Sequence, residues 1–123
     1  TAYEIGVRLV GSEMCIRDRY EGRIDVQAIC RGHGKFASTW AVSSEDLPLL
    51  HGLGAISGEI VKNHNDINLI TTDDSAKKVV KKLGSDISII LGSNGCLSTG
   101  KTLRESCFPY LEVFLLEMNQ MIF

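Results

Sequence analysis

The alternation of hydrophobic and polar residues predicts strands and helices in succession from residue 24 onward. Residues Ile24–Cys30 (IDVQAIC) alternate apolar and polar and end apolar, which is typical of a strand. A tight turn, RGHG, follows, and Lys35–Val42 (KFASTWAV) then places Phe36 and Trp40 on one helical face. The next apolar stretch, Leu47–Leu50, contains a proline and is expected to be a connection or a short helix.

The middle of the chain carries the clearest helix. Gly58–Val61 and Ile67–Ile70 are short strand candidates on either side of a polar turn, KNHND. The segment TTDDSAKKVVKKLG then has a Thr72 cap, acidic residues in its first turn, apolar residues at helical spacing and lysines before a closing glycine. Asp86–Leu91 (DISIIL) predicts a strand. GSNG makes a turn, after which Cys96–Thr99 can extend the strand.

A last helix is predicted after the capping box formed by Thr102 and Glu105. Its apolar stripe runs from Leu103 to Ile122, and Pro109 within it predicts a kink that costs about 3 kcal/mol unless the surroundings adapt. The order strand–helix–strands–helix–strand–helix indicates an α/β or α+β layered domain.

Composition and charge narrow the functional classes. The 123 residues suffice for one small domain, and 44% hydrophobic with 23% charged residues is ordinary for a soluble globular protein. A net charge of −2 gives no signature of polyanion binding, so no nucleic-acid partner is expected. No apolar run approaches the roughly 18–20 residues of a membrane span. The four cysteines form no C-x-x-C pair, which argues against a zinc ribbon or a redox pair and indicates buried or free thiols in a reducing compartment such as the cytoplasm.

One motif resembles a phosphate-binding loop. Gly95–Thr102 (GCLSTGKT) satisfies G-x-x-x-x-G-K-[ST], in which Lys101 would contact the outer phosphates and Thr102 would contact magnesium. Two features argue against nucleotide binding: the preceding apolar run ends early, at Leu91, and the loop carries a cysteine and a leucine. The alternative is that Gly100 makes a turn and that the Thr102 side chain caps the following helix.

From Ile24 to the C-terminus the chain resembles the class II aldolase/adducin family. The matching stretches are IDVQAICRGHGKFASTWAV and KKLGSDISIILGSNGCLSTGKTLRESCFPYLEVFLLEMNQM. The order of a strand, a His-x-His position, a helix, an apolar strand, an Asn-His-Gly position and a Gly-x-Thr-x-x-Glu helix start carries the resemblance. It implies an α/β, three-layer αβα fold truncated at the N-terminus, with residues 20–123 as a partial domain.

The resemblance also identifies candidate metal ligands. In the family, both histidines of the His-x-His and the histidine of the Asn-His-Gly bind a divalent metal, usually zinc, that polarises a carbonyl. The matching positions here hold Arg31, His33 and Asn94. Arg31 is a permanent cation that would repel a metal, and Asn94 is a weak neutral ligand. His33 is therefore the single retained candidate ligand. We expect no cofactor, with zinc as the alternative if the family site survives, and we assign no catalytic residue.

Three functions follow from these observations. The favoured hypothesis is a fragment of a class II aldolase/adducin-like protein without metal-dependent lyase activity, serving in assembly or binding. The first alternative is an active metal-dependent aldolase or epimerase-type lyase acting on a sugar phosphate or similar hydroxy-carbonyl substrate. The second alternative is nucleotide binding through GCLSTGKT. The resemblance also implies a homo-oligomer.

The N-terminal stretch VGSEMCIRDR, residues 10–19, has neither helical nor strand periodicity. It resembles translated sequencing-adapter sequence, and the family resemblance begins only after it. We therefore expect residues 1–19 not to be native to this protein, and the organised chain to begin near Tyr20.

Overall fold

The computed structural model describes residues 22–48, 52, 55, 58, 60–92 and 94–109. The expected non-native segment 1–19 and the later part of the last predicted helix lie outside these residues. The elements are β1 Ala28–Gly32, α3 Lys35–Ala41, β2 Leu47–Pro48, β3 Ile60–His64, α4 Asp73–Leu83, β4 Ser88–Leu91, β5 Cys96–Gly100 and α5 Leu103–Pro109.

The strands form one mixed sheet in the order β1-β5-β4-β3-β2. β3 and β4 pair in parallel, and the other three neighbouring pairs are antiparallel. Parallel neighbours need a crossover connection, and α4 supplies it between β3 and β4. β4 and β5 instead form a hairpin, so the predicted extension of the strand after GSNG is a separate strand running back along it.

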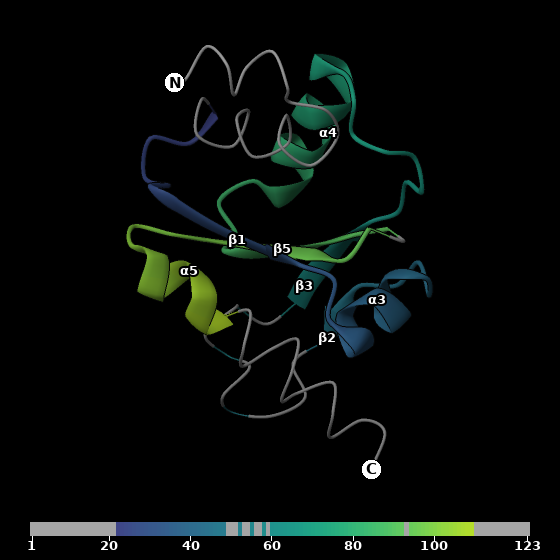
Figure 1. Cartoon of the computed structure of the whole chain (residues 1–123), viewed down its shortest axis with the longest axis horizontal. Coiled ribbons are helices and arrows are strands. Elements are labelled where there is room, and N and C mark those ends of the chain that lie inside the picture. Colours follow the sequence, from purple (N-terminus) through teal and green to yellow (C-terminus); the bar gives the residue numbers. More distant parts are fainter. Residues whose placement is uncertain are drawn as a thin grey trace.

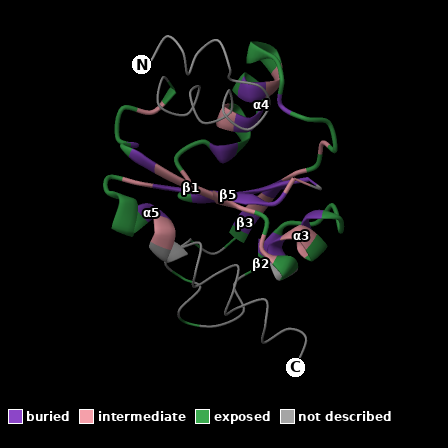
Figure 2. Ribbon diagram, in the orientation of Figure 1, coloured by how far each residue is buried: buried purple, intermediate pink, exposed green. Residues whose placement is uncertain are grey.

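Helices cover both faces of the sheet, with α4 on one side and α3 and α5 on the other (Figure 1). Side chains alternate along the central strands accordingly: Ile90 packs in a cluster with α3, whereas Ile89 and Leu97 pack in a cluster with α4. Among the described residues, the central strands β4 and β5 are the most buried (Figure 2). The expected three-layer αβα fold is therefore confirmed. Among the described helices, none is long and apolar enough to cross a membrane.

Local sequence signals correctly mark where two helices begin. At α4 the Thr72 hydroxyl accepts a hydrogen bond from the Ser75 backbone N–H at 3.2 Å. At α5 the Thr102 hydroxyl accepts from the Glu105 N–H, also at 3.2 Å. The Glu105 carboxylate accepts from the Lys101 N–H at 2.9 Å, one residue earlier than a standard capping box. The capping interpretation of Thr102 is confirmed.

The phosphate-loop interpretation of GCLSTGKT is wrong as a description of the backbone. Most of this segment is strand β5, which pairs with β1 on one side and β4 on the other. The Thr99 N–H, for example, donates to the Ile87 carbonyl at 2.8 Å. N–H groups that are bonded within a sheet cannot converge on a phosphate, so no cradle exists here.

The first strand begins later than its sequence pattern predicts. Ile24 was expected inside a strand, but it lies in a turn and is 97% exposed. β1 pairs with β5 from Ala28 opposite Gly100, and the chain then turns into α5 at Thr102. The residues before Ala28 therefore have no further β5 residues to pair with. The strand β1 extends from Ala28 to Gly32.

Two further predictions in the middle of the chain are corrected. The expected turn KNHND mostly belongs to strand β3, and Ile67–Ile70 is not a strand. Polar residues fit in β3 because they have partners: Lys62 pairs with Asp86 at 2.8 Å, and the buried Asn63 amide donates to the Glu45 carbonyl at 3.2 Å. The short stretch Leu47–Pro48 is an edge strand paired with β3, not a connection or helix.

Candidate functional site

The end of β1 meets the turn between β4 and β5. Gly32 lies opposite Cys96 in the register, so His33 comes directly beside the residues that precede β5. Gly95 has a φ of +81°, and a Cβ added to it would lie 2.2 Å from the Gly32 carbonyl oxygen and 3.2 Å from Cδ2 of His33. The backbones approach so closely that only glycine fits at position 95. This contact brings the three positions identified by the resemblance into one place.

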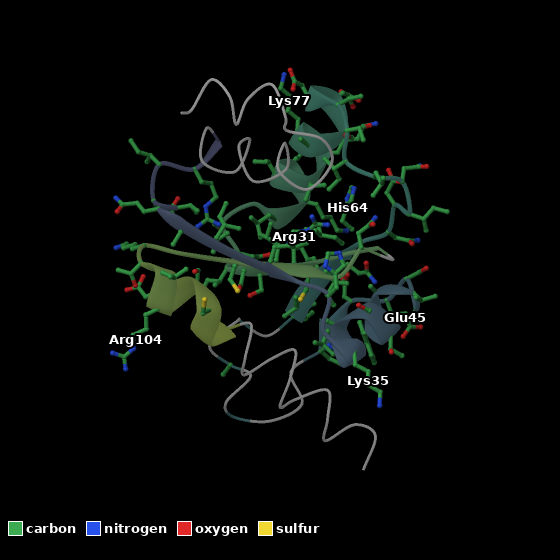
Figure 3. The ribbon with its side chains drawn as sticks, viewed as in Figure 1. Arg31, Lys35, Glu45, His64, Lys77 and Arg104 are labelled. Atoms are coloured by element: carbon green, nitrogen blue, oxygen red, sulfur yellow. The ribbon has the colours of Figure 1, made fainter. Side chains whose placement is uncertain are left out.

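Arg31 and Asn94 contact each other directly. Nη2 of Arg31 donates a hydrogen bond to the Asn94 carbonyl oxygen at 3.3 Å. Both residues are half-buried, whereas His33 is exposed. In Figure 3, Arg31 lies over the middle of the sheet, while the Lys35 side chain points from α3 away from it. The guanidinium is therefore held at the β4–β5 turn.

The Asn94 side chain binds the segment between β3 and α4. Its amide nitrogen donates to the carbonyl oxygens of Ile67 and Asn68 at 3.5 and 3.4 Å. Its backbone N–H donates to the Leu91 carbonyl at 2.7 Å, which closes the β4–β5 turn. Asn94 thus joins the turn to the segment between β3 and α4, and its amide nitrogen points at that segment.

The segment after β3 is itself fixed by an aspartate that the sequence analysis did not single out. Asp66 accepts hydrogen bonds from the backbone N–H of Asn68 at 2.9 Å and from its amide at 2.8 Å. These bonds, and more weakly the nearby His64, hold the pKa of Asp66 below its ordinary value. The D-x-N spacing, which is typical of an Asx turn, is the sequence signal that could have identified it.

The residues at this site do not fit a zinc ion. Structural and catalytic zinc sites use three or four His, Cys, Asp or Glu ligands. Within the described part of the chain, no group of three such side chains is placed to hold a metal. Arg31 is a cation without acceptor atoms, and Asn94 could offer zinc only the neutral oxygen of its side-chain amide, which is not among the usual zinc ligands. His33 is the one imidazole among the three positions, so we derive no reaction step through a metal.

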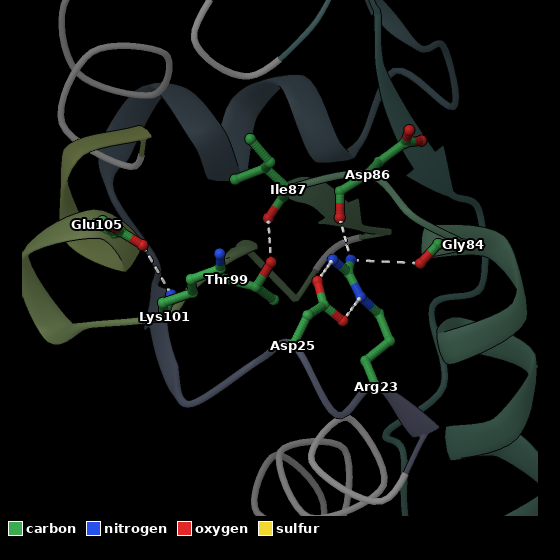
Figure 4. A network of polar contacts seen from close by, with 8 residues as sticks. All are labelled: Arg23, Asp25, Gly84, Asp86, Ile87, Thr99, Lys101 and Glu105. Atoms are coloured by element: carbon green, nitrogen blue, oxygen red, sulfur yellow. Dashed lines mark hydrogen bonds and ion pairs between the residues drawn. The ribbon is translucent and has the colours of Figure 1, made fainter.

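A second polar cluster lies before the start of β1 and is structural. The Arg23 guanidinium pairs with Asp25 and donates to the backbone carbonyls of Gly84, at 3.3 Å, and Asp86 (Figure 4). It thereby ties the segment before β1 to the loop between α4 and β4. Its hydrogen bonds hold the pKa of Asp25 below its ordinary value. Because these partners engage the guanidinium, Arg23 is not a candidate ligand-binding residue.

Comparison with known proteins places the chain by its fold. The sequence matches no protein-family model and no curated protein. Among solved structures, an L-fuculose 1-phosphate aldolase superposes with a TM-score of 0.73 at 24% identity, covering 81% of this chain and 47% of that one. An L-fuculose 1-phosphate aldolase from Glaciozyma antarctica PI12 gives 0.71 at 17%, covering 92% and 42%.

An aldolase II superfamily protein from Pseudomonas syringae gives a TM-score of 0.74 at 17% identity, covering 88% of this chain and 43% of that one. This chain thus spans less than half the length of these three structures. At such identities the likeness concerns the fold alone. The chain has the layered α/β fold that solved class II aldolase superfamily proteins share.

Proposed function

We propose that this chain is a class II aldolase/adducin-like domain that binds no catalytic metal and carries no metal-dependent lyase activity. The observation that supports this most directly is the hydrogen bond from Nη2 of Arg31 to the Asn94 carbonyl. It joins two of the three positions that correspond to metal ligands. A guanidinium there supplies a fixed positive charge where the family places a metal ion.

The domain would then serve in binding or assembly, with a small carbonyl compound or a sugar phosphate as its ligand class. Solved aldolases of the same fold support that class of ligand. We further propose a cytoplasmic protein that forms homo-oligomers. The free thiols Cys30, Cys96 and Cys107 support a reducing compartment.

An active metal-dependent lyase is the second candidate. It is favoured by the exposure of His33 and by the place of its ring beside Gly95, next to the β4–β5 turn. An imidazole in that position could reach an ion if other ligands approached. On this alternative the substrate would be a sugar phosphate or a similar hydroxy-carbonyl compound.

Zinc uptake separates the two candidates. The full chain is dialysed against zinc and then against buffer, and bound metal is measured by atomic emission. We expect no stoichiometric zinc in the unaltered chain and no cleavage of L-fuculose 1-phosphate. The double variant Arg31→His with Asn94→His restores three imidazoles, so we expect it to take up zinc.

A matched control adds a histidine elsewhere. Lys35→His introduces an imidazole on the side of α3 that points away from the sheet, and it should bind no more zinc than the unaltered chain. One zinc per unaltered chain, lost in His33→Ala, would overturn the proposal and establish the lyase candidate's metal site.

A further inference from the structure

Three thiols that are far apart in the sequence lie on one face of the sheet or in the helix α5 that packs on that face. Cys30 lies in β1, Cys96 in β5 and Cys107 in α5. Cys30 is the antiparallel partner of Ser98, so the two side chains share a face of the sheet. The Ser98 hydroxyl donates to the Ser106 carbonyl in α5, which places α5 over that face.

Cys107 directly follows Ser106 in α5, which packs against β1, and its thiol lies near enough to Cys30 to affect the pKa of that thiol. Both cysteines are free and half-buried, so a small reagent can reach them. Burial, together with the neighbouring Cys107 thiol, raises the pKa of Cys30 to about 11. Cys30 is therefore a thiol at neutral pH, and its thiolate becomes available only as the pH rises.

Cys96 differs from the other two thiols. It is fully buried, and its sulfur donates a weak hydrogen bond to the Gly32 carbonyl at 3.7 Å. Burial also raises its pKa. Cys96 is expected to stay inert because its full burial keeps a reagent away from its sulfur, whereas Cys30 and Cys107 are half-buried.

We propose that Cys30 and Cys107 are a modification site at which a reversible intramolecular disulfide ties β1 to α5. The sequence does not predict this site, because the two cysteines form no C-x-x-C pair and come together only when α5 packs on β1. Cys30 immediately precedes Arg31, so the disulfide would also anchor the strand that carries the candidate ligand site. The proposal is independent of whether that site binds a metal.

The reaction uses a low-molecular-weight disulfide, such as oxidised glutathione, as the oxidant. One cysteine thiolate attacks the reagent disulfide, forming a mixed disulfide and releasing one reagent thiol. The second cysteine loses its proton and attacks the protein sulfur of that mixed disulfide, which releases the second reagent thiol. Two protein thiols are oxidised, one reagent disulfide is reduced, and an excess of reagent thiol reverses the reaction.

The test uses the full chain carrying Cys15→Ser, because Cys15 lies outside the described residues and would otherwise compete. The folded protein is incubated with oxidised glutathione at mildly alkaline pH, and remaining thiols are trapped with N-ethylmaleimide. We expect free thiols to fall from three to one, with a mass loss of two hydrogens before trapping. Peptide mapping should link the Cys30 and Cys107 peptides, and the thermal unfolding midpoint should rise.

Two control variants make the outcome decisive. In the same background, Cys107→Ser and Cys30→Ser should each give no intramolecular link and no rise in the unfolding midpoint. A chain that retains three thiols, gains only glutathione adducts, links through Cys96 or forms disulfide-linked dimers overturns the proposal. If a serine variant fails to fold, peptide mapping of the oxidised parent chain still tests the proposal, because it identifies directly which two cysteines are linked.

Discussion

The close approach of Gly95 to β1 makes Gly95→Ala the most informative single substitution. A Cβ at this position would lie 2.2 Å from the Gly32 carbonyl oxygen, and the backbone has a φ of +81°. Two separate costs follow. An L side chain in the left-handed region costs roughly 1–2 kcal/mol, and forcing packed atoms apart costs about 1–3 kcal/mol more. We therefore expect Gly95→Ala to lower the free energy of unfolding by about 2–5 kcal/mol.

Gly58 provides a matched control, because it has a φ of +98° but nothing lies within 4 Å of an added Cβ. Gly58→Ala should show only the conformational cost of about 1–2 kcal/mol. Gly52 has no positive φ, and nothing lies within 4 Å of a Cβ added to it. Gly52→Ala should therefore change the free energy of unfolding by close to zero, which provides a baseline. The difference between Gly95→Ala and Gly58→Ala isolates the contact between the β4–β5 turn and β1.

Urea unfolding followed by tryptophan fluorescence measures all three variants. Trp40 is the single tryptophan, and it packs against the cluster formed with α3. The free energy of unfolding of a small domain is typically about 5–15 kcal/mol, so the expected loss is readily resolved. If Gly95→Ala and Gly58→Ala lose the same stability, the inferred contact between Gly95 and Gly32 is wrong.

Three further predictions concern the α5 cap, the hydrophobic core and the pH dependence of stability. Thr102→Ala should lower the free energy of unfolding by about 1 kcal/mol through loss of the α5 cap, and an unchanged urea midpoint would contradict that cap. Leu97→Ala should cost about 2–5 kcal/mol because Leu97 is fully buried, whereas Ile67→Ala, at 73% exposure, should change stability little; equal losses in urea titrations would contradict the core assignment. The Arg23 hydrogen bonds hold the folded pKa of Asp25 below 3.8, so their contribution is present above the unfolded pKa and lost as pH falls through the folded pKa. The stability difference between the unaltered chain and Asp25→Asn should therefore shrink from about pH 5 to about pH 3, and a pH-independent difference in thermal unfolding would contradict the interaction.

Part of the candidate site could be predicted from the sequence. The family resemblance pointed to Arg31, His33 and Asn94, and the structure brings these residues together at the β4–β5 turn. The hydrogen bond from the Arg31 guanidinium to the Asn94 carbonyl joins residues 63 positions apart, and no local pattern encodes such a contact. The turn that Asp66 forms with Asn68 is local, and its D-x-N spacing was available in the sequence.

Local patterns determined the elements whose signals lie within a few residues. The Thr72 cap, the apolar positions and the closing Gly84 were enough to place α4, because capping and helical periodicity act over a few residues. The apolar run that contains β4 was likewise correctly predicted to be a strand. A strand that is buried on both faces is apolar at successive positions, and β4 is buried throughout.

Tertiary pairing decided the elements whose local signals were ambiguous. The apolar Ile67–Ile70 is not a strand, whereas the polar Lys62–His64 is, because the latter pairs with β4 and finds partners for its side chains. The same pairing made GCLSTGKT a strand rather than a phosphate loop, and it set the start of β1 at Ala28. A strand exists only where a neighbour completes its hydrogen bonds, and that neighbour is chosen by the whole fold.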